Sequence, residues 1–261
     1  MKTRLLSLLF VVALLWGTPA HAQLVTPGEA GVVLGHLHLL ARDVEATKKF
    51  FVVLGGTPVQ NGSLQLIQFP GVFVMIREGQ PAGPMASAVV NHVGLNVPEL
   101  KTAVARWRAA GLTVDVTRDD QAWLLTPDGA RIEIFEDRAT VEPIRMHHIH
   151  WRVTQVPEAQ AWYAKHFGAV PGKRRQYDVV DLPGLNMTFQ KWETVYPGTR
   201  GRALDHVGFE VRHLDQFVAR LEAAGVKMEG PIRKASNGKT SIAFLTDPWG
   251  TYIELTEGLA P

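Results

Sequence analysis

An internal repeat of about 56 residues constrains the fold of this chain more than any other feature. Four segments begin alike: Gly35-His36-Leu37-His38-Leu39, Asn91-His92-Val93-Gly94-Leu95, His147-His148-Ile149-His150-Trp151 and Asp205-His206-Val207-Gly208-Phe209. Their aligned histidines recur at intervals of 56, 56 and 58 residues. A fixed period of this length indicates one supersecondary unit used four times, because such a unit cannot bury its apolar face alone.

Each repeat has the pattern of a strand, a helix and further strands. A short run with period-2 alternation opens the repeat, and a helical stripe that ends at a glycine follows it. The clearest stripe is Leu100, Ala103, Val104 and Trp107. A turn that contains proline and glycine, such as Pro70-Gly71, then precedes the last strand. The sequence therefore predicts an α+β fold built from four such units.

The four units differ in a way that predicts how they pair. Units one and three open with His-x-His, whereas units two and four open with His-Val-Gly and carry Glu133 or Glu254 four residues beyond the turn glycine. The corresponding positions in units one and three hold Met75 and Thr188. This alternation indicates that a two-unit domain was duplicated. We expect domains at residues 32–137 and 146–258, joined by a polar linker at residues 138–145.

These residues resemble the vicinal oxygen chelate superfamily. The resemblance rests on a histidine, a polar residue seven positions later that starts a helix, a glycine at the helix end, and Pro-Asp-Gly or Asp-Pro-Trp-Gly before Ile-Glu. The superfamily includes glyoxalase I, methylmalonyl-CoA epimerase, fosfomycin-resistance proteins, bleomycin-binding proteins and extradiol dioxygenases. The resemblance covers residues 35–258 and implies βαβββ units paired into two glyoxalase-like domains, whose curved mixed sheets form a metal-binding cup.

The resemblance also implies two sets of metal ligands. It places His36, His92 and Glu133 in the first domain, and His148, His206 and Glu254 in the second. Many relatives add a fourth ligand, Glu or Gln, where this chain has Met75 or Thr188, so the ring-cleaving and fosfomycin-resistance branches are favoured. Two imidazoles and one carboxylate leave open positions on a divalent metal; Fe²⁺ and Mn²⁺ are favoured, and Zn²⁺ and Ni²⁺ would also bind.

Further polar residues share the faces of these ligands. Period-2 alternation puts His150 and Arg152 with His148, Glu210 with His206, and Tyr252 with Glu254. We expect these four to be catalytic residues of the second domain, although Arg152 and Glu210 pairing with each other is the alternative. His38 and His150 suit either acid–base roles or a fourth ligand position. The comparable positions of the first domain are more apolar, at Leu40, Met75 and Phe135, so the first cup is expected to be structural, weakly binding or vestigial.

The N-terminal residues and the composition of the chain limit where the protein is located and what it binds. Lys2 and Arg4, an apolar run at residues 5–16 and Ala20-His21-Ala22 predict a signal peptide at residues 1–22 that is cleaved after Ala22. We therefore expect a periplasmic or secreted protein without a membrane anchor after cleavage. The chain has no cysteine, which excludes disulfides, cysteine-ligated metals and thiol nucleophiles. Removing Lys2 and Arg4 from 27 basic residues leaves 25 against 25 acidic ones, so nothing recruits nucleic acid.

Two classes of function fit these features. The favoured one is a metal-dependent enzyme that acts on a small substrate through adjacent oxygens, with an extradiol-type dioxygenase ahead of a glyoxalase- or epimerase-type lyase or isomerase. The other is a small-molecule binding protein of the bleomycin-resistance kind. Export counts against CoA thioesters and glutathione adducts. The extra histidine and tyrosine that ring-cleaving relatives place around the metal have no obvious counterparts here. The run Lys173-Arg174-Arg175 is interpreted as a solvated loop, with contact to an anionic substrate as the alternative.

Overall fold

The structure is a computed structural model that describes residues 24–260. The predicted signal peptide at residues 1–22 and its cleavage site after Ala22 therefore lie outside the described residues. Within residues 24–260, no helix is both long and apolar enough to cross a membrane.

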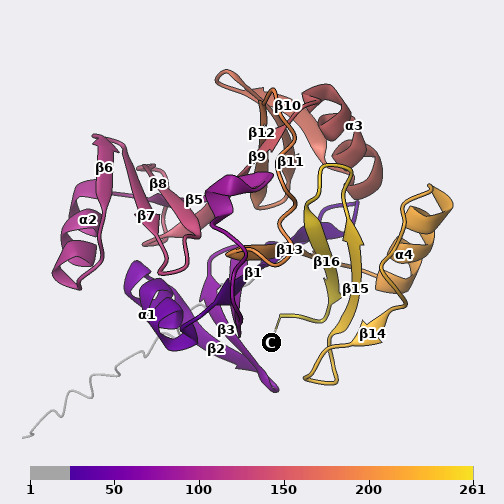
Figure 1. The fold of residues 1–261 in the computed structure, drawn as a ribbon, viewed down its shortest axis with the longest axis horizontal. Helices are drawn as coiled ribbons and strands as arrows, with labels where there is room; N and C mark the ends of the chain where they lie inside the picture. Colours follow the sequence, from indigo (N-terminus) through magenta and orange to yellow (C-terminus); the bar gives the residue numbers. More distant parts are fainter. Residues whose placement is uncertain (1–23, 261) are drawn as a thin grey trace, which may run out of the picture.

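Two curved mixed sheets of eight strands form the molecule (Figure 1). The strand order is β14-β15-β16-β13-β1-β4-β3-β2 in the first sheet and β10-β11-β12-β9-β5-β8-β7-β6 in the second. Helices α1 and α4 contact the first sheet, and α2 and α3 contact the second. In chain order the elements are β1 (Val32–Ala41), α1 (Val44–Leu54), β2 (Thr57–Asn61), β3 (Leu64–Phe69), β4 (Val72–Glu78), the short 3₁₀ helix η1 (Met85–Ser87), β5 (Val90–Val97), α2 (Leu100–Ala109), β6 (Asp115–Arg118), β7 (Gln121–Leu125), β8 (Arg131–Glu136), β9 (Arg145–Val153), α3 (Val156–Phe167), β10 (Val170–Arg174), β11 (Tyr177–Leu182), β12 (Leu185–Lys191), β13 (Leu204–Val211), α4 (Leu214–Ala223), β14 (Arg233–Lys234), β15 (Ser241–Thr246) and β16 (Tyr252–Glu257).

Each repeat folds as the expected βαβββ unit. The residue seven positions after each aligned histidine is the N-cap of a helix. Asp43 and Glu99 accept hydrogen bonds from the backbone N–H groups of Ala46 and Thr102, which satisfies donors that a helix start leaves free. The prediction of an α+β fold with four βαβββ units in two glyoxalase-like domains is confirmed.

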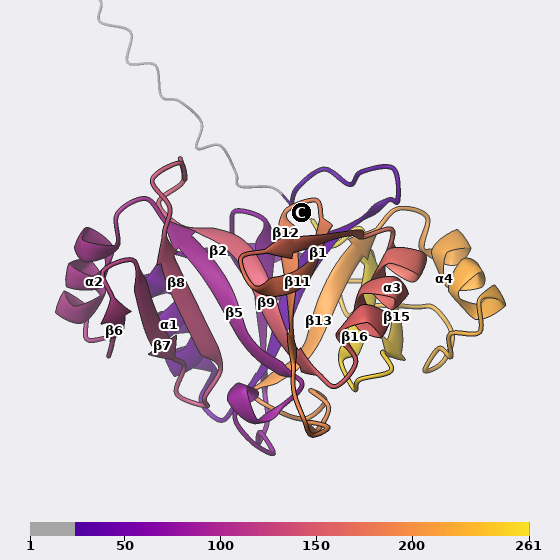
Figure 2. The same ribbon diagram turned by 90° about the horizontal axis from the view of Figure 1, so that it is seen from above.

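The units pair across the two halves of the chain, and not within them. Strand β1 of unit one pairs with β13 of unit four, and β5 of unit two pairs with β9 of unit three, both antiparallel. Figure 2 shows β1 beside β13 and β5 beside β9 at the middle of the molecule. The expectation that residues 32–137 and 146–258 each build their own cup is therefore wrong, while the expected linker at residues 138–145 leads from β8 to the start of β9. Units two and four offer the same His-Val-Gly strand, so the sequence pattern fits either partner.

One hydrophobic core joins the two sheets. It takes buried side chains from both, among them the predicted core residue Trp107. The indole N–H of Trp107 donates to the Leu54 carbonyl at the end of α1, at 3.0 Å. The Trp151 indole likewise donates to the Thr251 hydroxyl at 3.0 Å. Units that are adjacent in sequence thus pack through side chains, while units from opposite halves pair through strands.

This arrangement predicts the behaviour of a chain cut in the linker. Val141 is 88% exposed, so a specific protease site introduced there should be cleaved in the folded protein. Because both β1–β13 and β5–β9 ladders cross the cut, the two fragments should remain together at the size of the intact protein. Size-exclusion chromatography checks this, with denaturant as the control that separates them. Fragments that part in native buffer would contradict the observed pairing.

Candidate metal centres

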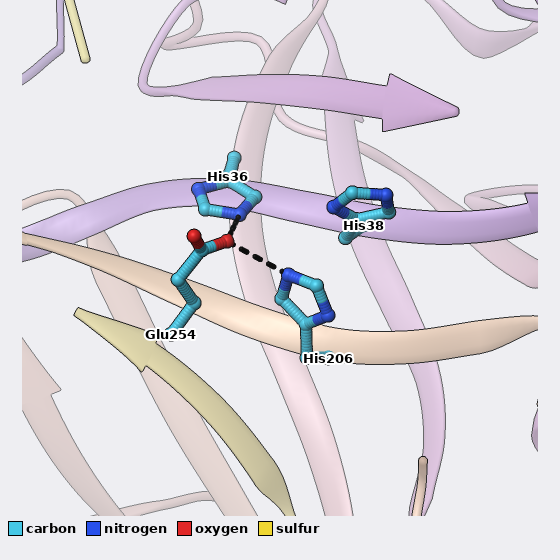
Figure 3. A group of neighbouring side chains, drawn as sticks. All are labelled: His36, His38, His206 and Glu254. Atoms are coloured by element: carbon cyan, nitrogen blue, oxygen red, sulfur yellow. Dashed lines mark hydrogen bonds and ion pairs between the residues drawn. The ribbon is translucent and has the colours of Figure 1, made fainter. Parts of the chain in front are cut away.

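The first candidate site lies where β1, β13 and β16 meet. The Glu254 carboxylate oxygen Oε2 lies 2.9 Å from His36 Nε2 and 2.9 Å from His206 Nε2. All three side chains are buried, at 0–6% exposure. Figure 3 shows the Glu254 carboxylate between the two imidazole rings, with His38 beside them on the strand of His36. We call His36, His206 and Glu254 the first site.

The second candidate site repeats this arrangement in the other sheet. His92 on β5, Glu133 on β8 and His148 on β9 converge there, and His150 lies beside them. Glu133 Oε2 is 3.0 Å from His92 Nε2 and 3.2 Å from His148 Nε2, and the two Nε2 atoms are 3.2 Å apart. We call His92, Glu133 and His148 the second site.

The structure thus regroups the predicted ligands. All six share the two sites, but His148 joins His92 and Glu133, and His36 joins His206 and Glu254. The predicted sets that follow the two halves of the chain are wrong, because the strands pair across the halves. Register explains the contacts: Gly208 lies opposite His36 on β1 and beside Glu254 on β16.

Sequence reasoning missed residues that hold the ligand rings in place. Asp205 Oδ1 lies 2.6 Å from His206 Nδ1, and Asn91 Oδ1 lies 2.8 Å from His92 Nδ1. Each lies at an irregularity in strand pairing: the β1–β13 register passes from His206 to Leu204, and the β5–β9 register passes from Val90 to His92. A bulge re-aims the extra side chain, so residues that simple alternation places on the opposite face reach the ligands. The only signal in the sequence is their position directly before a histidine.

The ligands of the second site are also braced by arginine. Arg131 donates to Asn91 Oδ1 at 2.9 Å, which identifies this atom as the amide oxygen. The same oxygen therefore accepts a hydrogen bond from the Nδ1–H of His92. Arg174 donates to His147 Nδ1 at 3.2 Å, and His147 Nδ1 lies 2.9 Å from the Nδ1 atom of His148. Arginine only donates, so His147 Nδ1 accepts and the hydrogen belongs to His148 Nδ1. His92 and His148 then both carry hydrogen on Nδ1 and direct a bare Nε2 toward Glu133.

These tautomers fit a cation. A bare imidazole Nε2 and a carboxylate oxygen about 3 Å apart repel each other unless a proton or a metal ion lies between them. Ligands that share an ion at about 2.1 Å lie about 3 Å apart when adjacent, which matches the observed distances. Asp205 beside His206 and Asn91 beside His92 supply the outer hydrogen bond that ligating histidines usually make. The donor sets at both sites therefore suit a divalent metal.

A glycine beside each site makes room for one ligand ring. A Cβ atom on Gly94 would lie 1.9 Å from His148 Cε1, and one on Gly208 would lie 2.1 Å from His36 Cε1. No side chain fits at such distances without displacing the imidazole. The His-Val-Gly signature thus serves the histidine of the partner strand.

Met75 and Thr188, which stand where many relatives have a fourth metal ligand, do not take over that role. Met75 is in register with His38, and Thr188 is in register with His150. The Thr188 hydroxyl donates to Asn186 Oδ1 at 2.7 Å. His38 and His150 are the nearest additional donors, and the buried His38 nitrogens and His150 Nε2 make no hydrogen bond within residues 24–260.

The cup around the first site is partly filled by the chain itself. Leu259 is buried against Phe73 and Leu66, with Met75 alongside, and Phe73 is in register with His36. Glu210 Oε1 accepts from the backbone N–H groups of Gly258 at 2.7 Å and Leu259 at 3.2 Å. Glu210 therefore anchors residues 258–260, and we assign it this role in place of the predicted catalytic one.

The other predicted catalytic residues divide between the two sites. Tyr252 packs against His206 with ring centroids 5.5 Å apart, and the Arg200 guanidinium lies 4.4 Å from the centre of its ring. Arg152 lies in the other sheet, where it donates to the Tyr196 hydroxyl at 3.1 Å. Arg152 and Glu210 therefore do not pair. The predicted ranking of a second-half cup over a first-half cup no longer applies, because each site combines both halves.

The second site opens into a cavity of about 470 Å³. Its lining includes all three ligands, His150 and Tyr177, and the aromatic residues Trp123 and Phe135. Five arginines also line it: Arg118, Arg131, Arg152, Arg174 and Arg175. The run at residues 173–175 was expected to be a solvated loop, but two of its arginines face this cavity.

Burial disfavours the charged form of three histidines that line the cavity, His92, His147 and His150. It lowers the pKa of His92 to about 4 and the pKa values of His147 and His150 to about 3. Burial alone would raise the pKa of Glu133, but its contacts with His148 and His92 lower it well below its ordinary value. At the first site, burial opposes charge on His206, yet contacts with Asp205 and Glu254 raise its pKa.

Comparisons with known proteins agree with this fold. The model of the Glyoxalase/Bleomycin resistance protein/Dioxygenase superfamily matches residues 145–255. The match covers less than half of the chain, and the solved structures below show that the described chain has a glyoxalase-like fold. Glyoxalase I from Zea mays superposes with a TM-score of 0.68 at 17% identity, over 87% of this chain and 92% of that one. A "putative dioxygenase" from Bacillus subtilis subsp. subtilis str. 168 superposes with a TM-score of 0.65 at 13% identity, over 90% and 86%.

These structures establish the fold alone, because their identities are low. The curated proteins include no match to the sequence. The family-model match and the histidine clusters support metal binding.

Substituting the two glycines should separate the two metal sites. Gly94→Ala should displace the His148 ring and lower the bound Mn²⁺ by one equivalent, and Gly208→Ala should do the same at the first site through His36. Gly172→Ala is the matched control, because its Cβ would meet Val179 at an ordinary 3.6 Å. Metal analysis after dialysis measures the stoichiometry. Full loading of the Gly94→Ala protein would argue against the second site.

The lowered pKa values of His92, His147 and His150 predict that the stability of the metal-free protein depends on pH. Their pKa values in the folded state lie below the ordinary 6.5, so below pH 6.5 the unfolded chain takes up protons that the folded protein does not. These three histidines therefore contribute stability that is fully present above pH 6.5 and is lost as the pH decreases. Between pH 7 and 5 each histidine contributes a loss of up to about 2 kcal/mol. His150→Asn should reduce that loss by about 1–2 kcal/mol in urea unfolding; an unchanged pH dependence would contradict the assignment.

Proposed function

We propose that the protein is an exported, divalent-metal-dependent enzyme whose active site is the second site, and that it cleaves a ring bearing two adjacent oxygens with dioxygen. The observation that carries this proposal is the cavity: His92, Glu133 and His148 face a 470 Å³ space, whereas Leu259 fills part of the first cup. A small substrate has access to the second site, and the first site is better suited to holding an ion structurally.

His150 and Tyr177 favour ring cleavage over the other reactions. Their rings lie edge to face with centroids 5.1 Å apart, and both line the cavity. They supply the histidine and the tyrosine that the resemblance implies around the metal of ring-cleaving enzymes. The sequence did not show this pair, because Tyr177 lies on β11 and reaches the site only through the curvature of the sheet.

The protein residues would position the substrate and accept its proton. A divalent ion held by His92, Glu133 and His148 would supply Lewis-acid stabilisation of the substrate oxygens and a place for dioxygen. His150 Nε2 is buried and without a hydrogen-bond partner in the described chain, so it is free to accept a proton from a substrate hydroxyl. The negative charge of the ionised substrate would raise the low pKa of His150 toward 7.

A glyoxalase- or epimerase-type isomerisation is the second candidate function. It rests on the same free His150 Nε2, which would serve equally well to abstract a proton from carbon. The two reactions differ in their need for dioxygen. Oxygen uptake that accompanies loss of substrate supports ring cleavage, whereas equal turnover without air supports isomerisation.

Export remains part of the proposal. It rests on the charged start, the apolar run at residues 5–16 and the Ala20-His21-Ala22 site. Sequencing the N-terminus of the protein purified from its periplasm would test it, with Gln23 as the expected first residue.

The two sites can be ranked by single variants. His148→Ala should lower turnover in an aerobic catechol screen with Fe²⁺ by at least about a hundredfold, because it removes a ligand at the proposed active site. His36→Ala is the matched control at the first site and should mainly lower thermal stability and metal content. His150→Gln should keep both metals and lose about a hundredfold in kcat. Loss of turnover in His36→Ala with activity retained in His148→Ala would reverse the assignment.

A further inference from the structure

The cavity at the second site is lined by more arginines than carboxylates. Arg118 pairs with Asp120 at 3.2 Å, but Arg131, Arg152, Arg174 and Arg175 form no ion pair within residues 24–260. The lining has four carboxylates, Asp120, Glu133, Glu136 and Asp137, against five arginines, and Glu136 already pairs with Arg138 outside the lining. A cavity of this kind favours an anionic ligand.

Part of this charge gathers around one aromatic ring. The Cζ atoms of Arg118 and Arg175 each lie 5.9 Å from the centre of the Phe135 ring. Arg118 ends β6 and Arg175 follows β10, and these strands form the two opposite edges of the eight-stranded sheet. The curvature of the sheet thus brings two like charges from its far edges to the same ring. Asp120 already pairs with Arg118, whereas Arg175 forms no ion pair within residues 24–260, so Arg175 is the guanidinium beside this ring that is available to an anion.

The backbone of Arg175 gives an independent indication. Its φ is +52°, in the left-handed region that favours glycine, and it lies in the two-residue turn between Arg174 and Tyr177. His213, at φ +57°, is the other non-glycine residue with positive φ in the described chain. An arginine at such a position costs stability relative to glycine. A strained arginine at the rim of a ligand cavity points to a role for its side chain.

We propose that Arg118, Arg174 and Arg175 form a subsite for a carboxylate group of the substrate, with Phe135 against the adjoining carbon skeleton. The proposal rests on the proposed function, since the adjacent oxygens of the same molecule occupy the second site. Guanidinium groups bind carboxylates through paired, charge-assisted hydrogen bonds. The substrate class is therefore an aromatic or unsaturated acid that carries two neighbouring oxygens.

Two probes that differ only in a carboxylate test this subsite. Calorimetry on the Mn²⁺-loaded protein compares catechol with 3,4-dihydroxybenzoate, and the acid should bind at least about tenfold more tightly. Arg175→Gly should reduce that preference to less than about threefold, leave the Kd of catechol unchanged and leave Tm unchanged or raised. His213→Gly relieves the same kind of strain outside the cavity, so it should raise or maintain Tm without altering either affinity.

The outcomes separate the subsite from the active site. Catechol binding that depends on His148, with no preference for the acid or with an undiminished preference in Arg175→Gly, overturns the subsite and leaves the proposed function standing. Absence of metal-dependent catechol binding overturns the proposed function and the subsite with it. A fall in Tm in Arg175→Gly would show that Arg175 serves the folded structure and would also overturn the assignment.

Discussion

The antiparallel pairing of β1 with β13 and of β5 with β9 decides where every candidate ligand lies. In each pair a glycine stands opposite a histidine, Gly208 opposite His36 and Gly94 opposite His148. The parallel neighbour then adds a carboxylate at the same level, with Glu254 beside Gly208 and Glu133 beside Gly94. The glycine gives the imidazole the space to turn toward the carboxylate. Without this pairing each half of the chain would hold only part of either site.

Irregular pairing adds hydrogen bonds that hold the ligand rings within that frame. Each central ladder has two register shifts, and Asp205, Asn91 and His147 lie at three of them. Their side chains bond the Nδ1 atoms of His206, His92 and His148. The fourth shift falls at Gly35, where a Cβ would lie 2.9 Å from the Glu210 backbone nitrogen, and the Nδ1 of His36 has no partner among the described residues. The second site is therefore the more completely braced of the two.

The sequence was sufficient for the units and for the types of residue at each site, but insufficient for their grouping. Period-2 alternation and the 56-residue spacing predict the strands that carry His36, His92, His148 and His206. They do not distinguish β13 from β5 as the partner of β1, because both strands carry His-Val-Gly and bury equivalent apolar faces. Alternation also fails at bulges, so it assigns Asn91 to the wrong face. Arg175 and Tyr177 reach the cavity only through the curvature of the sheet, which no local pattern encodes.

The same backbone frame carries different charge at its two sites. The first site places Asp205 and Tyr252 where the second has Asn91 and Arg131, and it has Glu210 where the second has Asn96. A divalent ion between Glu254 and the Asp205–His206 pair would be largely neutralised and would retain little attraction for an anion. An ion at the second site faces one carboxylate, Glu133, and a cavity lined by arginines, so its charge remains available. With these residues the first site would favour the cation itself, and the second would favour an anionic ligand that approaches the cation.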